Sequence, residues 1–228
     1  MEPQNKTLSK DSNIEDIEDV LNIVEKSYSI KFKPNELMGK TFGELCNIIV
    51  SKIDLTDEDS CTTQQAFYKL RTAIIEITGL KKEQVLPDTN LKFIFPRFRR
   101  RINIKRVEKQ LGIKLHILWP WQPLVIFSSF LFIISLLGLF FNWRYGLVGI
   151  VTSIIFLAVG FKYGKELNNI TVGDLAEKMA TENYFKSRRN NTVNRKEIYK
   201  KVEYLFIDRL YLDCNEIKPE TLLVRQLQ

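Results

Sequence analysis

Two long apolar runs, separated by only three residues, constrain the fold of this 228-residue chain most strongly. Leu124–Phe141 and Tyr145–Phe161 contain no acidic or basic side chain. A helix needs about 20 residues to cross the roughly 30 Å hydrocarbon core of a bilayer. Globular helices usually keep a polar stripe, so a buried hairpin in a soluble protein is the weaker alternative. We therefore predict a transmembrane helical hairpin over residues 124–161, with antiparallel helices because the turn at residues 142–144 is short.

The residues that flank the hairpin predict its orientation. Amphipathic aromatic residues favour membrane interfaces, and basic residues favour the cytoplasmic side. Basic residues precede and follow the hairpin, whereas its turn carries only Arg144. We therefore expect a multi-pass protein of the bacterial inner membrane with both termini in the cytoplasm. The expected interface anchors are Trp119, Trp121, Trp143 and Tyr145.

Positive charge is concentrated just before the hairpin. The chain has a net charge of +7, and residues 91–116 carry nine basic side chains and one acidic one. Such juxtamembrane clusters attract anionic lipid head groups. Docking of an acidic protein, pairing with the acidic residues 54–60 and nucleic-acid binding are the alternatives, and nucleic acid is the weakest because the membrane is so near. The residues predicted to contact the membrane surface or a partner are Arg97, Arg99, Arg100, Arg101, Lys105 and Arg106.

The sequence lacks the usual signatures of an enzyme or a metal site. Its single histidine is His116, and its three cysteines are far apart and odd in number. This pattern argues against a zinc site, a disulfide scaffold and a histidine-based triad. There is no glycine-rich phosphate loop, nucleophile elbow or CxxC motif. We therefore predict a protein that is not an enzyme and has no metal and no cofactor. The polar residues 1–10 are expected to form a flexible leader.

A short phrase occurs twice, as TFGEL from Thr41 and TVGDL from Thr171. In both copies a threonine precedes an acidic residue by three positions, which is the capping-box pattern of a helix start. Capping boxes recur in unrelated proteins and could explain this likeness alone. The similarity extends further, however, because Ala66–Leu91 and Glu197–Leu223 each predict an amphipathic helix, a polar loop and a proline turn, LPDTNL or KPETLL.

These segments resemble the acyl carrier protein family. The matching residues are ITGLKKEQVLPDTNL for a first helix and its loop, RRINIKRVEKQLGIKL for the second helix, and TVGDLAEKM for the last. The resemblance implies an all-α fold with two small carrier-like modules and the hairpin. One module would combine residues 62–116 with the last helix at residues 168–183, so that the hairpin is an insertion into it.

The remaining segments would form a second, circularly permuted module. Residues 11–54 correspond to the later helices, and residues 192–228 correspond to a first helix and its loop. We expect these two chain ends to pack together. Exchange between two chains, or completion by another protein, are the alternatives.

A working carrier holds phosphopantetheine on a serine at the start of its second helix, where the helix N-terminus favours phosphate. Here the corresponding stretch is FIFPRFRRR, and about Arg99 takes the place of that serine. Only Ser12 and Ser60 follow an aspartate, and both are expected to be capping or loop residues. They are the alternative attachment sites for phosphopantetheine.

We therefore expect a non-catalytic, membrane-anchored adaptor or scaffold. Its partners would be the lipid bilayer and a protein, for which proteins of lipid or acyl-thioester metabolism are the candidates. The short hairpin is also compatible with a homo-oligomer. The alternatives are a functional membrane-tethered acyl carrier protein and a membrane immunity protein that neutralises a toxin.

Overall fold

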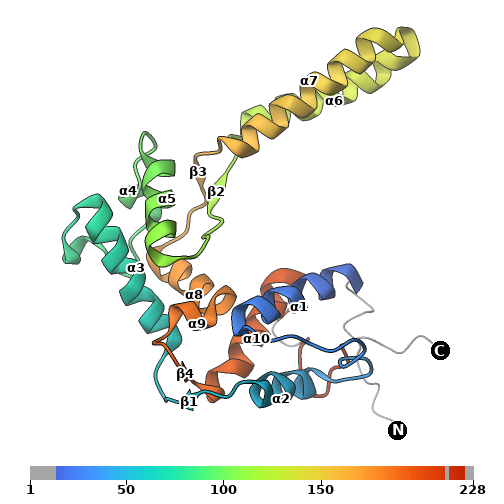
Figure 1. Ribbon diagram of the computed structural model, residues 1–228. Coiled ribbons are helices and arrows are strands. Elements are labelled where there is room, and N and C mark those ends of the chain that lie inside the picture. The colour runs from blue at the N-terminus through green and yellow to red at the C-terminus, as the bar shows by residue number, and fades with distance from the viewer. Residues whose placement is uncertain (1–13, 214–215, 224–228) are drawn as a thin grey trace. The chain divides into compact units, whose positions relative to one another are not determined.

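The computed structural model describes residues 14–213 and 216–223, and it is almost entirely helical (Figure 1). The predicted all-α class is confirmed at this level, since the β-elements among the described residues are four strands of two residues each. The helices are α1 (Ile14–Tyr28), α2 (Phe42–Lys52), α3 (Thr62–Thr78), the 3-10 helix η2 (Lys82–Gln84), α4 (Leu91–Ile94), α5 (Arg100–Leu111), α6 (Gln122–Phe141), α7 (Trp143–Lys162), α8 (Val172–Glu182), α9 (Tyr184–Ser187) and α10 (Arg195–Leu210).

The chain forms two compact units. The first falls within residues 1–73, 111–113 and 173–228, and the second within residues 74–110 and 114–172. Each unit contains one pair of short strands. In the first, β1 (Thr56–Asp57) pairs in parallel with β4 (Thr192–Val193), and in the second, β2 (Leu118–Trp119) pairs antiparallel with β3 (Glu166–Leu167).

The core of the first unit joins helices from the two ends of the chain. α10 packs against both α1 and α2. Phe42 is fully buried at the start of α2, and its ring meets those of Tyr199 and Phe206 on α10 edge to face, with centroids 5.2 and 5.5 Å apart. Apolar residues at intervals of three and four on α1 lie in the same core. We expect most of the stability of this helix to come from packing of that apolar face, because short helices are only marginally stable alone.

The capping box predicted at Thr41 is confirmed. The Thr41 side chain accepts the backbone N–H of Glu44 at 3.2 Å, and the Glu44 carboxylate accepts the N–H of Thr41 at 2.9 Å. These two bonds satisfy donors that the helix itself leaves unpaired. The second copy of the phrase also precedes a helix, because α8 begins directly after Thr171.

Both copies of the phrase also pair with a proline loop through the same backbone bonds. An isolated antiparallel bridge joins Thr41 to Leu222, and another joins Asn90 to Thr171. The likeness of these loops is therefore more than a recurrent capping box, because corresponding residues make corresponding bonds. In the first unit the N–H groups of Phe42 and Leu223 donate to the carbonyls of Thr221 and Lys40 at 2.8 and 3.1 Å; in the second, those of Val172 and Leu91 donate to Thr89 and Ile170 at 3.0 and 3.1 Å.

α1 and α5 each make the same kind of hydrogen bond to the segment that follows the helix, which is a third match between the two units. The Glu25 carboxylate on α1 accepts the backbone N–H of Phe32 at 2.7 Å, seven residues later. The Glu108 carboxylate on α5 accepts the N–H of Leu115 at 2.8 Å, with the same spacing. Superposing these two bonds in the sequence aligns Arg99 with Asp16.

The hairpin consists of α6 and α7, which lie side by side in the second unit (Figure 1). The Ser128 hydroxyl on α6 donates to the Ser153 carbonyl on α7 at 2.7 Å. Small buried residues recur at intervals of seven along the contact, which lets two backbones approach closely. They are Ser128 and Ser135 on α6, and Gly146, Ser153 and Gly160 on α7.

Candidate functional site

The base of the hairpin is the candidate site, because a groove opens there between polar and apolar walls of the second unit. The volume of this groove is about 1020 Å³. Lys92, Arg97 and Glu166 form its charged side. The apolar side comes from the tryptophans before α6, the first turns of α6 and Phe161 near the end of α7.

The walls of the groove are held by the pairing of β2 with β3. Leu118 lies opposite Leu167, and Trp119 lies opposite Glu166. The chain returning from α7 passes very close to β2 at Gly164, where an added Cβ would lie 2.5 Å from the Trp119 carbonyl oxygen. Only glycine fits at such a distance. The two chain segments at the hairpin base, before α6 and after α7, are therefore fixed against one another.

Two arginines fasten the returning chain to the segment before α5. The Arg97 guanidinium donates to the Glu166 carboxylate at 2.6 Å. Arg100 donates from Nε to the Phe95 carbonyl at 2.8 Å and from Nη1 to the Lys165 carbonyl at 2.6 Å. Burial lowers the pKa of Arg100, although the ordinary value is so high that the side chain stays charged at neutral pH.

The prediction that Arg100 contacts the membrane surface or a partner is wrong. Its exposed fraction is 6%, and its Nε and Nη1 atoms donate to backbone carbonyls inside the protein. The basic cluster alone could not show this. In a run of basic residues, the sequence does not distinguish an arginine that bonds carbonyls inside the protein from one that faces solvent. Arg100 is a structural residue of the hairpin base.

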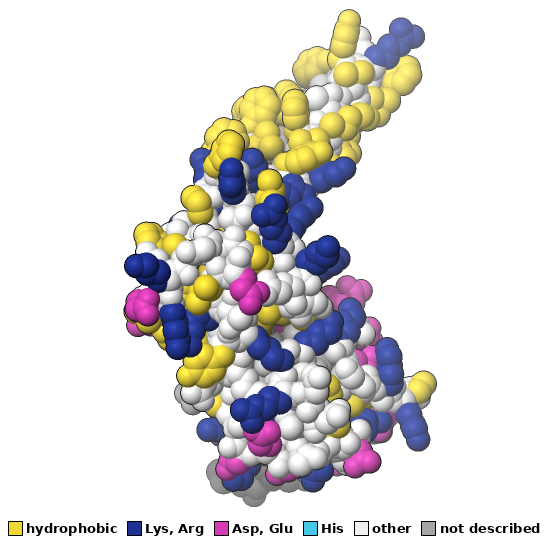
Figure 2. Space-filling model, turned by 60° about the vertical axis from the view of Figure 1, so that its left-hand side comes forward, with side chains coloured by type: hydrophobic (Ala, Val, Ile, Leu, Met, Phe, Trp, Pro, Cys, Tyr) yellow, Lys and Arg dark blue, Asp and Glu magenta, His cyan; other side chains and the backbone are white. Residues whose placement is uncertain are grey.

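The other predicted basic residues lie nearer the surface. Arg97, Arg99, Lys105 and Arg106 are exposed, and Figure 2 shows dark blue side chains gathered below the apolar hairpin. Arg101 is half-buried, with its guanidinium 5.3 Å from the centre of the Tyr163 ring. Of the six predicted residues, Arg97 is the one that lines the groove.

The predicted interface anchors lie at the two ends of the hairpin. Trp119 and Trp121 precede α6 and line the groove, while Trp143 and Tyr145 lie in the first turn of α7 at the other end. All four side chains are exposed. Asn142 forms the whole turn, and its side chain accepts the N–H of Arg144 at 3.1 Å, which caps α7.

The field around the groove is positive. Residues 91–172 contain twelve lysines and arginines and only two acidic residues, Glu108 and Glu166. Glu108 accepts the N–H of Leu115, and Glu166 accepts from Arg97. Anions are therefore favoured at this end of the hairpin.

The alternative attachment serines receive little support from their surroundings. Ser60 lies two residues before α3, and its hydroxyl accepts from Arg188 at 2.9 Å and from Gln65 at 2.8 Å. It thus serves the loop before a helix, as expected for a loop residue. Ser12 lies outside the described residues.

Sequence reasoning missed the Arg188 network in the first unit. Arg188 is fully buried and donates to the carbonyls of Glu58 and Ser60 at 3.0 and 2.7 Å and to the Thr62 hydroxyl at 2.6 Å. Glu197 lies 3.6 Å from the guanidinium. Arg188 and Arg189 are adjacent and alike in sequence, and only packing distinguishes the buried one from the exposed one.

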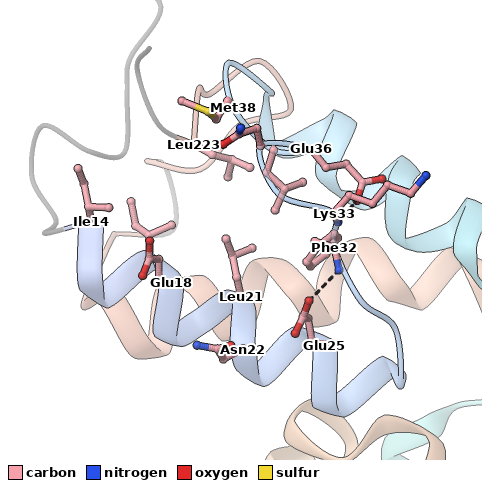
Figure 3. A pocket seen from close by; sticks show the side chains of 13 residues that line it. Ile14, Glu18, Leu21, Asn22, Glu25, Phe32, Lys33, Glu36, Met38 and Leu223 are labelled. Carbon is pink, nitrogen blue, oxygen red and sulfur yellow. Dashed lines mark hydrogen bonds between the residues drawn. The ribbon is translucent and has the colours of Figure 1, made fainter. Parts of the chain in front are cut away.

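A second cavity, of about 480 Å³, lies in the first unit between α1 and the following loop (Figure 3). Leu21, Met38 and Leu223 contribute apolar side chains to it. At its edge the Glu25 carboxylate accepts the Phe32 N–H, and this bond lowers the pKa of Glu25. Sequence reasoning missed this cavity because it depends on the approach of Leu223 from the far end of the chain.

Within residues 14–213 and 216–223, no group of three or more His, Cys, Asp or Glu side chains could hold a metal ion. Comparison with protein families, with curated proteins and with solved structures finds no match to this chain.

Proposed function

We propose that the protein is a non-catalytic adaptor anchored in the bacterial inner membrane by the α6–α7 hairpin, with both helical units in the cytoplasm. Its partners would be the bilayer and a protein, for which enzymes of lipid or acyl-thioester metabolism are the candidates. The observation that carries this proposal is the contrast between the inside and the outside of the hairpin.

The inside of the hairpin is small and hydroxyl-bearing, whereas its outside is large and apolar. Both helices have 20 residues and are long and apolar enough to cross a membrane. Phe130, Leu137 and Val148 are exposed by 62, 59 and 65%. Burying one such side chain is favourable by about 1.5–3 kcal/mol, so removing this surface from water is strongly favourable. A bilayer covers all sides of both helices at once.

The charge distribution supports the proposed orientation. The basic residues of α5 and of Lys162–Lys165 lie at the base of the hairpin, and the turn at the other end carries Arg144 alone. Positive residues are retained on the cytoplasmic side. This distribution supports a cytoplasmic position for the hairpin base and for both termini.

The matched hydrogen bonds support a binding role in place of carrier chemistry. If both modules resemble acyl carriers, Arg99 and Asp16 occupy the position of the modified serine, because the Glu25 and Glu108 bonds align them. Neither side chain can accept phosphopantetheine. A chain that keeps the helices and loops without this serine suits recognition of another protein.

The anchoring and its orientation can be tested by thiol labelling in cells. Cys61 is exposed, whereas burial raises the pKa of Cys46 to about 12 and makes it unreactive. In a Cys46→Ser, Cys214→Ser background, a membrane-impermeant maleimide should label Cys61 only after the inner membrane is permeabilised. The matched variant, Cys61→Ser with Arg144→Cys, should be labelled in intact spheroplasts.

The same cells provide the decisive fractionation. We expect the chain in the membrane pellet after alkaline carbonate washing and in solution only after detergent is added. A monodisperse protein in the detergent-free soluble fraction would refute the anchor, and labelling of Cys61 in intact spheroplasts would refute the orientation. Co-expression with a phosphopantetheinyl transferase should leave the intact mass unchanged; a mass gain would establish a carrier instead.

A further inference from the structure

We propose that the groove at the hairpin base is a binding site for the head group of one anionic glycerophospholipid. This inference rests on the proposed membrane insertion and adds a ligand and a location to it. It differs from general attraction between basic residues and a charged surface, because it assigns selectivity to the groove residues alone.

The groove has the two chemistries that a phospholipid needs. Lys92 and Arg97 lie on its polar side, and Asn169 adds an amide whose oxygen accepts from Asn90 at 2.7 Å. Trp121, Ile126 and Phe161 also line the groove, and the last two belong to α6 and α7, whose outward apolar side chains are exposed. A phosphate on the polar side therefore leaves the acyl chains along the hairpin.

The place of the groove along the hairpin also suits a head group. Trp119 and Trp121 line it, and tryptophan favours the level of the head groups in a bilayer. The volume of about 1020 Å³ is ample for a phosphoglycerol group together with the first part of an acyl chain. The position and the size of the groove thus agree with its chemistry.

Arg97 retains donors for a phosphate while it is paired. One of its nitrogens, Nη2, donates to the Glu166 carboxylate. A guanidinium has five N–H donors and binds phosphate well. With Lys92 the groove has two cations and one carboxylate, so its net charge is positive. This balance favours an anionic lipid over a zwitterionic one.

The groove is built before a lipid arrives. Arg100 donates to the Phe95 and Lys165 carbonyls, and Trp119 belongs to β2, which pairs with β3. A preformed wall loses little conformational entropy on binding, which allows selective occupancy at one place. An acidic protein segment lacks the acyl chains that would cover the apolar side, so the lipid is the better occupant.

The experiment uses tryptophan quenching in the full-length chain. A Trp143→Phe variant leaves Trp119 and Trp121 as the fluorophores, since Trp143 lies at the far end of the hairpin. The protein is placed in phosphatidylcholine nanodiscs that contain a small fixed fraction of either brominated phosphatidylglycerol or brominated phosphatidylcholine. We expect stronger quenching by the brominated phosphatidylglycerol at equal mole fraction.

Two double variants of equal charge separate the groove from the general field. Lys92→Gln with Arg97→Gln should reduce the preference for phosphatidylglycerol at least about tenfold per cation removed, because a direct hydrogen bond to a charged group is worth about 1.5–3 kcal/mol. Arg106→Gln with Lys109→Gln removes two exposed charges of α5 outside the groove and should retain most of the preference.

Each outcome decides the proposal. Equal quenching by the two brominated lipids, or an equal loss in both double variants, would overturn the groove site and leave membrane insertion intact. Failure of the chain to co-purify with nanodiscs of any composition would refute the insertion itself, and the lipid site with it. Co-purification of all variants, with loss of selectivity only in the groove variant, is the supporting result.

Discussion

The backbone N–H of Phe42 donates to the carbonyl oxygen of Thr221 at 2.8 Å, which ties the start of α2 to the loop that follows α10. The two residues come from opposite ends of the chain, and each belongs to one copy of a repeated pattern. The ring of Phe42 is also fully buried, so this contact lies beside the core of the first unit.

Phe42→Ala should destabilise the first unit by about 3–5 kcal/mol, because it removes a buried ring from between Tyr199 and Phe206. The measurement is urea unfolding in a mild detergent, followed by far-UV circular dichroism. Phe98→Ala is the matched control, since that side chain is 89% exposed and its loss should change the free energy of unfolding by less than about 0.5 kcal/mol. Equal effects would contradict the described core.

Arg188→Met should lower the free energy of unfolding by about 3–5 kcal/mol, because it removes the guanidinium donors to the Glu58 and Ser60 carbonyls and leaves Glu197 without its nearby cation. Arg189→Met provides the comparison at the adjacent position. The Arg189 side chain is 75% exposed and pairs with Glu58 at the surface, so its loss should cost at most about 1 kcal/mol. The same urea titration distinguishes the two variants. A change of less than about 1 kcal/mol in the free energy of unfolding for Arg188→Met would disprove the buried network.

Gly164→Ala should open the hairpin base, because the new methyl group would meet the Trp119 carbonyl. We expect faster amide hydrogen exchange at β2 and β3 in the variant, measured by mass spectrometry in detergent. Gly138→Ala is the matched control in the hairpin, since its methyl group would meet Gly146 at an ordinary 3.8 Å. Unchanged exchange in Gly164→Ala would show that this close approach is not maintained.

The stability of the first unit should fall in acid partly through Glu25. The pKa of Glu25 lies below its ordinary value of 4.5, first because the carboxylate accepts the Phe32 N–H and then because Lys31 is near. A lowered folded-state pKa gives stability that is fully present above the unfolded value and is lost as the pH falls through the folded value. Glu25→Gln should therefore lower the urea midpoint at pH 7 and flatten its decline below about pH 4.5. If the urea midpoint of Glu25→Gln falls with decreasing pH as steeply as that of the unsubstituted protein, Glu25 does not contribute to the loss of stability in acid.

Local patterns in the sequence were enough to predict the helical class, the two apolar helices and the capping box at Thr41. Each of these depends on interactions between residues a few positions apart, or on the absence of charge over about 20 residues. The repeated phrase likewise predicted two helix starts, and both α2 and α8 begin there.

Side-chain environments within the charged segments could not be predicted in the same way. Arg100 and Arg188 look like their exposed neighbours Arg99 and Arg189 in the sequence, yet both are buried. Their burial depends on carbonyl groups at Lys165, Ser60 and Glu58, which are brought to them by folding. No local propensity records such a contact.

The sequence by itself thus determined which segments are helical and which are oily enough for a bilayer, since periodicity, charge and capping act over short distances. The tertiary structure alone decided that the proline loop near Thr221 meets Phe42, that the groove lies between Arg97 and Trp121, and that Arg100 faces inward. These features join residues distant in the chain, and the physical reason is that burial and hydrogen-bond satisfaction are settled only when distant segments meet.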